Sequence, residues 1–308
     1  MLSILHVSDL HFGPPHVPHV SEAVLRATSE LKFDLIVASG DFTQRATREQ
    51  YAQAREFLDR LPDVPTVVVP GNHDVPLYRV FERVFAPYRL YREYISDELD
   101  AVYRLDNAVI VALNSTSPLR AITNGRIDGW QLDFGERAFR AAPPDAARIV
   151  VTHHHFAPAP DYEGGEVMPR AKRAIDCFSD IGVELILGGH LHRAYVGNSL
   201  DVYPGRDREH GIIIVQSGTT TSRRGRARER EKNSLNVIRV GEDRVRVTHY
   251  MYFDELLGFA PVSRHLFPRL GRHFLADGTV DVEDGIALSR PIGVPEPADM
   301  VPGLRPPG

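Results

Sequence analysis

Short apolar runs, each bounded by turn residues, recur along the chain. They cover residues 4–7, 35–38, 66–69, 109–113, 149–152, 185–187, 212–215, 235–240 and 245–251. Their lengths and their content of β-branched residues predict strands that are buried on both faces. Because the first six alternate with helical patterns, we expect an α/β fold with parallel strands. From residue 211 onward, strand follows strand without helices, which predicts antiparallel partners for the sheet.

Helical periodicity is clear in three segments, which are residues 21–31, 47–61 and 128–140. In the second segment the apolar positions form a single stripe, and Thr47 with Gln50 matches a capping box. Ser21 and Asp128 are the expected N-caps of the other two helices. Trp130 lies on the helical pattern, and we expect it in the core.

The pattern changes again beyond residue 253, where prolines become frequent. We expect residues 1–253 to form one domain. We expect residues 254–308 to form an extended, partly packed tail with little regular structure.

Composition narrows the class of protein. The chain of 308 residues is 43% hydrophobic and 25% charged, which is typical of a soluble globular protein. Its net charge of −5 argues against a dedicated nucleic-acid-binding domain. Cys177 is the single cysteine, so an intrachain disulfide and a Cys-based zinc site are excluded. No apolar run approaches the roughly 20 residues of a membrane span, and the N-terminus lacks a signal-peptide pattern, so we expect a cytoplasmic protein.

Side chains that bind metals follow five of the predicted strands. The sequence reads SDLH, SGDF, GNHD, THHH and GGHLH at these points. In open α/β sheets the carboxyl ends of strands form the ligand crevice. Asp-x-His and His-x-His spacings place both side chains on the same side of an extended backbone. Each motif alone is typical of a turn or a cap, but the five together predict a site for divalent metal ions.

These motifs, in this order over residues 4–192, resemble the signature of the calcineurin-like metallophosphoesterase superfamily. The segment SGTTTSRRGRARE, residues 217–229, is similar to one in bacterial members related to class III cyclic-nucleotide phosphodiesterases. The resemblance implies a four-layer αββα sandwich with mixed sheets and two divalent metal ions (Mn, Fe or Zn). By motif position it assigns Asp9, His11 and His192 to the first metal. It assigns Asn72, His153 and His190 to the second metal, and Asp41 to both.

The resemblance also implies roles beside the metals. His153 is the expected ligand of the histidine triplet because it is the first His after that strand, and His154 is the alternative. His73 would act outside the metal shell as proton donor or charge stabiliser. Asp74 is expected to brace the loop. Gln44 stands where protein phosphatases of the superfamily carry Asp, which argues against protein phosphatase activity.

The arginine-rich run at 223–230 has two readings. It is either a solvated charged turn or a site for substrate phosphate, where bidentate geometry favours Arg. In the second reading Arg223 and Arg224 contact the substrate, and His154 is a further candidate contact.

The implied activity is hydrolysis of a phosphodiester by a hydroxide that bridges two metals and attacks phosphorus in line. The expected partner is a small phosphodiester, with 3′,5′-cyclic AMP leading. Alternatives are another phosphodiester or pyrophosphate (a glycerophosphodiester, a nucleotide-linked lipid precursor or a dinucleoside polyphosphate) and a non-catalytic scaffold of the same fold. The sequence is also compatible with a homo-oligomer.

Overall fold

Two six-stranded sheets form the centre of the computed structural model, which describes residues 1–120, 123–159, 166–203, 211–271 and 290–295. The first sheet has the strand order β12-β11-β10-β1-β2-β3, and the second β4-β5-β6-β7-β9-β8. The first comprises β1 (Leu2–Val7), β2 (Leu35–Ala38), β3 (Thr66–Val68), β10 (Ser234–Val240), β11 (Arg244–Phe253) and β12 (Gly258–Pro268). The second comprises β4 (Ala101–Leu105), β5 (Ala108–Ala112), β6 (Ala147–Val151), β7 (Leu185–Gly188), β8 (Tyr195–Asn198) and β9 (Ile213–Gln216).

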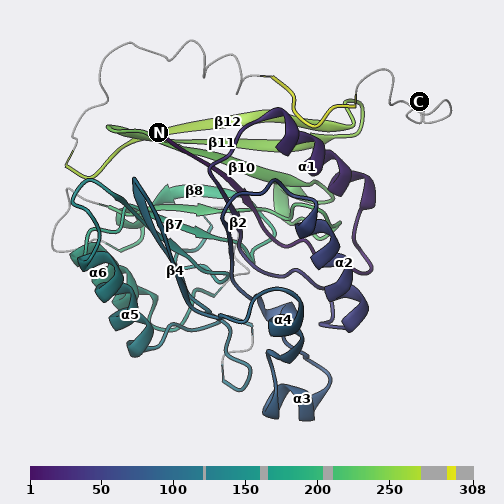
Figure 1. The fold of residues 1–308 in the computed structure, drawn as a ribbon, viewed down its shortest axis with the longest axis horizontal. Helices are drawn as coiled ribbons and strands as arrows, with labels where there is room; N and C mark the ends of the chain where they lie inside the picture. The colour runs from purple at the N-terminus through teal and green to yellow at the C-terminus, as the bar shows by residue number, and fades with distance from the viewer. Residues whose placement is uncertain (121–122, 160–165, 204–210, 272–289, 296–308) are drawn as a thin grey trace.

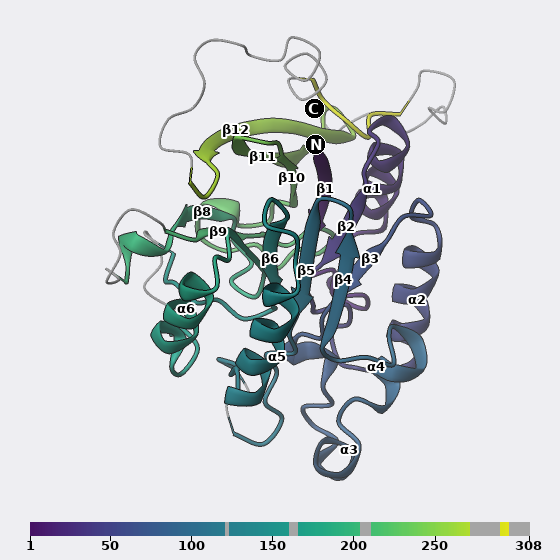
Figure 2. The ribbon, with the colours of Figure 1, turned by 60° about the vertical axis from the view of Figure 1, so that its left-hand side comes forward.

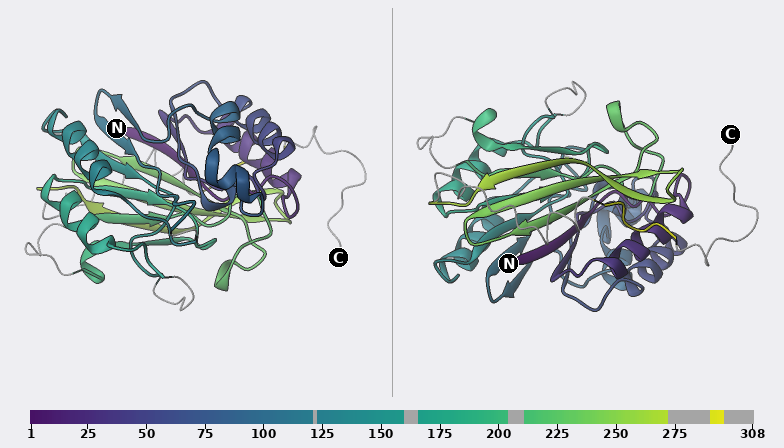
Figure 3. Two further views of the ribbon diagram at one scale, coloured as in Figure 1. Left: turned by 90° about the horizontal axis from the view of Figure 1, so that it is seen from below. Right: turned by 90° about the horizontal axis from the view of Figure 1, so that it is seen from above.

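Helices cover the outer faces of both sheets, as Figures 1 and 2 show. On the first sheet these are α1 (Pro18–Glu30), α2 (Arg48–Asp59) and α4 (Arg89–Tyr94), with the short α3 (Val80–Phe85) beyond them. On the second they are α5 (Gly129–Arg140) and α6 (Ala171–Asp180). Three 3₁₀ turns complete the described elements: η1 (Asn72–Asp74), η2 (Ser199–Asp201) and η3 (Ala227–Glu229). In Figure 3 the purple and teal helices lie on opposite sides of the paired sheets.

Alternation along the strands explains the layers. In β1, Leu5 and Val7 pack in the core that contains α1 and α2, whereas Leu2 and Ile4 pack between the two sheets. Successive side chains of a strand point to opposite faces, so a strand buried on both faces contributes to two cores. The order helix, sheet, sheet, helix is the predicted four-layer αββα sandwich, and both sheets are mixed, as predicted.

All nine predicted strands are present. β1, β2 and β3 pair in parallel, as do β5, β6, β7 and β9. β10 adds antiparallel to β1, as the change of pattern after residue 211 predicts, but β9, the first strand of that stretch, continues the parallel pairing of β7. The strands that were not predicted are β4, β8 and β12, and each lies at or beside a sheet edge, where the apolar signal is weaker.

Two of the three expected helix caps are in place. Thr47 accepts the backbone N–H of Gln50, and the N–H of Asp128 is bound by the side chain of Gln131. The capping box at Thr47 is only half formed, because the side chain of Gln50 accepts the N–H of Arg45 rather than that of Thr47. Ser21 as a cap is wrong: α1 begins at Pro18, because proline is well suited to the first helical position. Trp130 in the core is also wrong, since it is 58% exposed on the outer side of α5.

After residue 253 the structure describes residues 254–271 and 290–295, and these differ from the expected tail; the rest of the predicted tail lies outside the described residues. β12 is an eleven-residue strand paired along the whole of β11. Phe259 within it is buried and exchanges two backbone hydrogen bonds of 2.6 Å with Ile292. Pro261 and Pro268 lie in β12, at the edge of the sheet, where proline is tolerated, and so did not exclude a strand. The division of the chain into domains at residue 253 stays a prediction.

None of the helices among the described residues is both long enough and apolar enough to span a membrane.

Candidate metal centre

The predicted site residues gather where the carboxyl ends of the two sheets meet. Asp9 and Asp41 follow β1 and β2 of the first sheet, and Asn72 follows β3. His153 follows β6 and His190 follows β7, both in the second sheet. The site is therefore built from two stacked sheets rather than from one edge of a single sheet.

One group of ligand atoms comes from Asp9, His11, Asp41 and His192. These atoms all lie within 4.8 Å of one another, and the four residues are buried. His192 Nε2 is 3.0 Å from Asp9 Oδ1, and His11 Nε2 is 3.6 Å from the same oxygen.

A second group lies beside the first and comprises His153, His154 and His190, again with ligand atoms within 4.8 Å. Asn72 joins it, because its Oδ1 is 2.9 Å from His190 Nδ1 and 3.3 Å from His153 Nε2. The carboxamide thus faces the same point as the two imidazoles.

Asp41 stands between the two groups. Its Oδ2 is 3.7 Å from His11 Nε2 in the first group and 3.4 Å from His153 Nε2 in the second. Its Oδ1 accepts the backbone N–H of His73 at 2.8 Å, which fixes the carboxylate. This is the position that a residue shared by two metals would take.

The donor set fits divalent cations. Among the described residues, no group donates a well-aligned hydrogen bond to the buried oxygens Asp9 Oδ1 and Asp41 Oδ2. A buried carboxylate oxygen is costly unless a cation or a donor compensates it. Imidazole, carboxylate and amide donors together suit Mn, Fe and Zn.

Backbone carbonyls orient three imidazoles. The Nδ1 atoms of His153, His192 and His73 lie 2.8, 3.1 and 2.9 Å from the carbonyl oxygens of Ser39, Arg224 and Gln44, respectively. Because a carbonyl oxygen can only accept a hydrogen bond, Nδ1 of each ring must carry the proton. In the neutral ring Nε2 then carries the lone pair. For His153 and His192, that lone pair faces the two groups, as a metal ligand requires.

Five of the seven predicted ligands have left-handed backbone conformations: Asp9, His11, Asp41, His190 and His192, with φ between 49° and 75°. Such conformations are uncommon outside glycine and concentrate at functional sites. The backbone that packs against these residues must also lack bulky side chains. A Cβ on Gly71 would lie 2.2 Å from Asp41 Oδ1, so only glycine fits there.

Charge pairing dominates the buried acids. Burial is the largest single effect on Asp41 and opposes its ionisation, but His153, His73 and His11 together outweigh it and hold the pKa of Asp41 well below its usual range. Burial is likewise the largest effect on His153 and opposes its protonation, yet Asp41, Asp9 and the carbonyl of Ser39 together raise the pKa of this imidazole to about 9. The site therefore strongly favours a negative Asp41 with a cation beside it.

Asp74 braces the loops, as expected. Its carboxylate accepts the backbone N–H groups of Phe42, Thr43 and Gly71 at 3.2, 2.9 and 2.9 Å. Burial, followed by the nearby charge of Asp41, raises the pKa of Asp74 to about 7. The carboxylate ties the loop after β2 to the loop after β3.

His73 and Arg224 lie beside the two groups. The His73 ring packs edge-on against His11, with centroids 4.9 Å apart. Arg224 donates to the side chain of Gln44 at 2.9 Å. Burial lowers the pKa of Arg224, and the charges of Asp41 and then Asp9 oppose this shift, which places its guanidinium near the carboxylates. Arg223 is exposed, so the structure favours Arg224 of the two.

Sequence reasoning missed several supporting residues. Ser115 Oγ lies 2.8 Å from His154 Nδ1, and His155 stacks on His190 with ring centroids 5.6 Å apart. Ser115 follows β5, so the rule that polar residues at strand ends build the site would have found it. The carbonyls of Ser39 and Gln44 carry no signal in the side-chain pattern.

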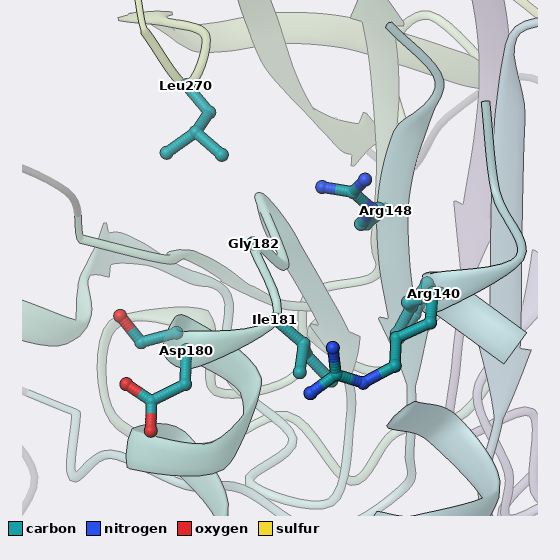
Figure 4. A pocket seen from close by; sticks show the side chains of 8 residues that line it. Arg140, Arg148, Asp180, Ile181, Gly182 and Leu270 are labelled. Carbon is teal, nitrogen blue, oxygen red and sulfur yellow. The ribbon is translucent and has the colours of Figure 1, made fainter. Parts of the chain in front are cut away.

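A cavity of about 620 Å³ lies away from this centre (Figure 4). Its lining includes Arg140 at the end of α5, Arg148 in β6, and Gly182 just after α6. Gly182 leads into the amino end of β7. The cavity therefore lies near the amino ends of the strands, whereas the predicted ligands follow the carboxyl ends. None of its lining residues is a predicted site residue.

Comparison with known proteins agrees with this geometry. A probable cyclic nucleotide phosphodiesterase from Synechococcus sp. is 26% identical over 220 residues, which cover 66% of this chain and 79% of that protein. The 3′,5′-cyclic adenosine monophosphate phosphodiesterase CpdA of Escherichia coli K12 is 28% identical over 169 residues, 51% of this chain and 56% of the relative. The match thus spans little more than half of the second protein.

The solved structures support the fold alone. Purple acid phosphatase PPD1 from yellow lupin superposes with a TM-score of 0.68 at 12% identity, over 89% of this chain and 55% of that chain. The family model described as calcineurin-like phosphoesterase matches residues 2–194, well over half of the sequence. The chain belongs to the calcineurin-like phosphoesterase family and is a phosphoester hydrolase of that family.

Proposed function

We propose that this chain hydrolyses a small phosphodiester with two divalent metal ions, and that 3′,5′-cyclic AMP is its substrate. The position of Asp41 carries the proposal. One oxygen of a single buried carboxylate faces an imidazole of each group, 3.7 Å from His11 and 3.4 Å from His153. That arrangement is what a two-metal site requires of a shared ligand.

The ligand assignment is the one that the family resemblance implies. Asp9, His11 and His192 would hold one ion, Asn72, His153 and His190 would hold the other, and Asp41 would be shared by both. When bound, two such ions offset the charge of a phosphodiester and lower the pKa of a coordinated water to as little as about 7.

Arg224 is proposed to bind a phosphate oxygen. Its guanidinium is half-buried close to Asp41 and Asp9, and the side chain of Gln44 holds it at 2.9 Å. A fixed, partly desolvated guanidinium makes stronger hydrogen bonds to an anion than a mobile surface arginine does. The Nε2 of His154, buried without a hydrogen-bond partner, is the second proposed substrate contact.

His73 is proposed to act on the leaving group. Its Nδ1–H is bound by the carbonyl of Gln44, so in the protonated ring Nε2–H is the proton left to donate. Donation to a leaving alkoxide is general acid catalysis, which typically contributes about 10²–10⁴-fold in rate.

The names of the two relatives support a cyclic nucleotide as the substrate, since both are called cyclic-nucleotide phosphodiesterases. The single, half-buried free cysteine, Cys177, supports a reducing compartment, and we propose that the protein is cytoplasmic.

A substrate panel tests this proposal. Purified protein with added Mn²⁺ is assayed on cyclic AMP, 2′,3′-cyclic nucleotides, glycerophosphocholine and a phosphomonoester. We expect the highest kcat/KM on 3′,5′-cyclic AMP, and a higher KM with little loss of kcat for Arg224→Gln. A preference for glycerophosphocholine would indicate a glycerophosphodiester as the substrate instead. Turnover of the phosphomonoester alone would overturn the proposed phosphodiesterase activity.

A further inference from the structure

The segment around α3 exposes an unusual set of apolar side chains. Phe81 is 82% exposed, Phe85 79%, Tyr78 70% and Val80 62%. Leu77 and Val84 are exposed beside them, and no residue of α3 is buried. We call these six residues the α3 tip. A cluster of large exposed apolar residues on a soluble protein usually marks an interaction surface.

The α3 tip projects from the molecule. In Figures 1 and 2, α3 lies at the bottom, beyond α4 and far from β12. Its base is held firmly, since Arg79 donates to the carbonyl of Ala46 at 2.7 Å and pairs with Glu82 at 3.1 Å. The guanidinium of Arg45 covers the ring of Tyr78 at 4.8 Å. The apolar side chains therefore extend outward from an anchored loop.

Positive charge surrounds the apolar residues. Residues 75–93 contain four arginines and two glutamates, a net charge of +2, whereas the whole chain carries −5. Those arginines are Arg79, Arg83, Arg89 and Arg92. Aromatic residues next to arginines on a projecting helix are the features that bind an anionic membrane interface.

We propose that the α3 tip docks on an anionic lipid bilayer. Phe81 and Phe85 enter the boundary between headgroups and acyl chains, and Arg83 and Arg92 face the anionic headgroups. A second copy of the chain fits less well, because two-fold association would bring two segments of net charge +2 together. The tip also protrudes rather than lining a groove, which favours a broad deformable surface over a peptide.

Docking by this surface brings the metal centre close to the bilayer. Leu77 and Arg83 line the same small crevice as Asn72, a predicted metal ligand. The inference itself does not depend on the proposed function, because binding to vesicles is measured without turnover.

Vesicle flotation tests the proposal with the full chain. The probes are vesicles of equal parts phosphatidylglycerol and phosphatidylcholine, and vesicles of phosphatidylcholine alone. We expect binding to the anionic vesicles only, weakened by 0.5 M salt. The double substitution Phe81→Ser/Phe85→Ser should lower the partition coefficient at least about tenfold, and Arg83→Gln or Arg92→Gln roughly fivefold each.

The matched control is Val262→Ser/Leu266→Ser, which removes two exposed apolar side chains from β12. It should bind like the unmodified protein. Unchanged turnover of bis(p-nitrophenyl) phosphate by the Phe81→Ser/Phe85→Ser variant shows that it is folded. Absence of binding by the unmodified protein, or equal loss in the control, would overturn the proposal. So would a dimer in analytical ultracentrifugation that is lost with the two phenylalanines, because the tip would then bind a second copy.

Discussion

Single side chains at the metal centre are positioned largely by the backbone. Carbonyls of Ser39, Gln44 and Arg224 each fix one imidazole, and the left-handed conformations aim the ligands that follow β1, β2 and β7. Those conformations are unfavourable by themselves, by about 1 kcal/mol or more each, and the surrounding loops maintain them. That these side chains gather was predictable from sequence because each follows a recognisable strand; their assignment as metal ligands stays a prediction. The carbonyls that orient them were not predictable, because every residue has one.

The role of His73 gives the first prediction. His73→Ala should retain metal but lose about 10²–10⁴-fold in kcat on a diester with a poor leaving group. The loss should be much smaller with p-nitrophenolate, which needs no proton to depart. The measurement is kcat for both substrates together with metal content. His19→Ala, an exposed histidine on α1, is the matched control and should be unchanged. Equal losses on the two substrates would contradict the proton-donor role.

His6 gives a prediction for stability against pH. This histidine is fully buried in β1 with Nε2 3.0 Å from Ser39 Oγ. Burial lowers its pKa from 6.5 to about 3, although the charge of Asp9 opposes the shift. Below pH 6.5 the unfolded chain therefore binds a proton that the folded chain does not, so stability is full above pH 6.5 and falls as the pH drops toward 3.

Between pH 7 and 5.5, His6 alone should lower the free energy of unfolding by about 1.3 kcal/mol. Urea denaturation in the presence of a chelator measures the free energy of unfolding at both pH values, with His6→Gln as the non-titrating reference. The unmodified protein should lose that much more stability than the variant. Parallel pH profiles for the two proteins would show that His6 titrates normally in the fold.

At the scale of elements, the central strands were predictable and the edges were not. A strand buried on both faces leaves a continuous apolar run, as in β5, where all five residues are buried. β4 and β12 mix exposed and buried positions, so their periodicity is weaker. The helix α1 was predicted from its stripe, but its start was missed because Pro18 rather than Ser21 begins it.

β12 provides the prediction at this scale. If the strand is an integral part of the fold, Phe259→Ala should lower the free energy of unfolding by about 3–5 kcal/mol, since the ring is fully buried against Tyr252 and Ile292. Leu266→Ala on the same strand is 42% exposed and should change it by less than about 0.5 kcal/mol. Denaturant titration of both variants is the measurement. Similar small effects for the two would mean that β12 is a loosely attached tail.

For the whole molecule, function depends on the stacking of two sheets. The first sheet supplies Asp9, His11, Asp41 and Asn72, and the second supplies His153, His190 and His192. The pairing of strands within each sheet follows from the alternation of strand and helix. Which strands share a sheet depends on non-local packing, and the sequence pattern alone carries no signal for it. The resemblance to a family supplied that part of the prediction.

The most direct test of the central claim is the metal content of the protein. Protein loaded with Mn²⁺ and desalted is analysed by inductively coupled plasma mass spectrometry, beside Asp41→Asn, which keeps the shape of the side chain and removes its charge. The account predicts about two ions per chain in the unmodified protein and a loss of at least one in the variant, because both groups share Asp41. Fewer than one ion per chain in the unmodified protein, or two ions retained by Asp41→Asn, would contradict it.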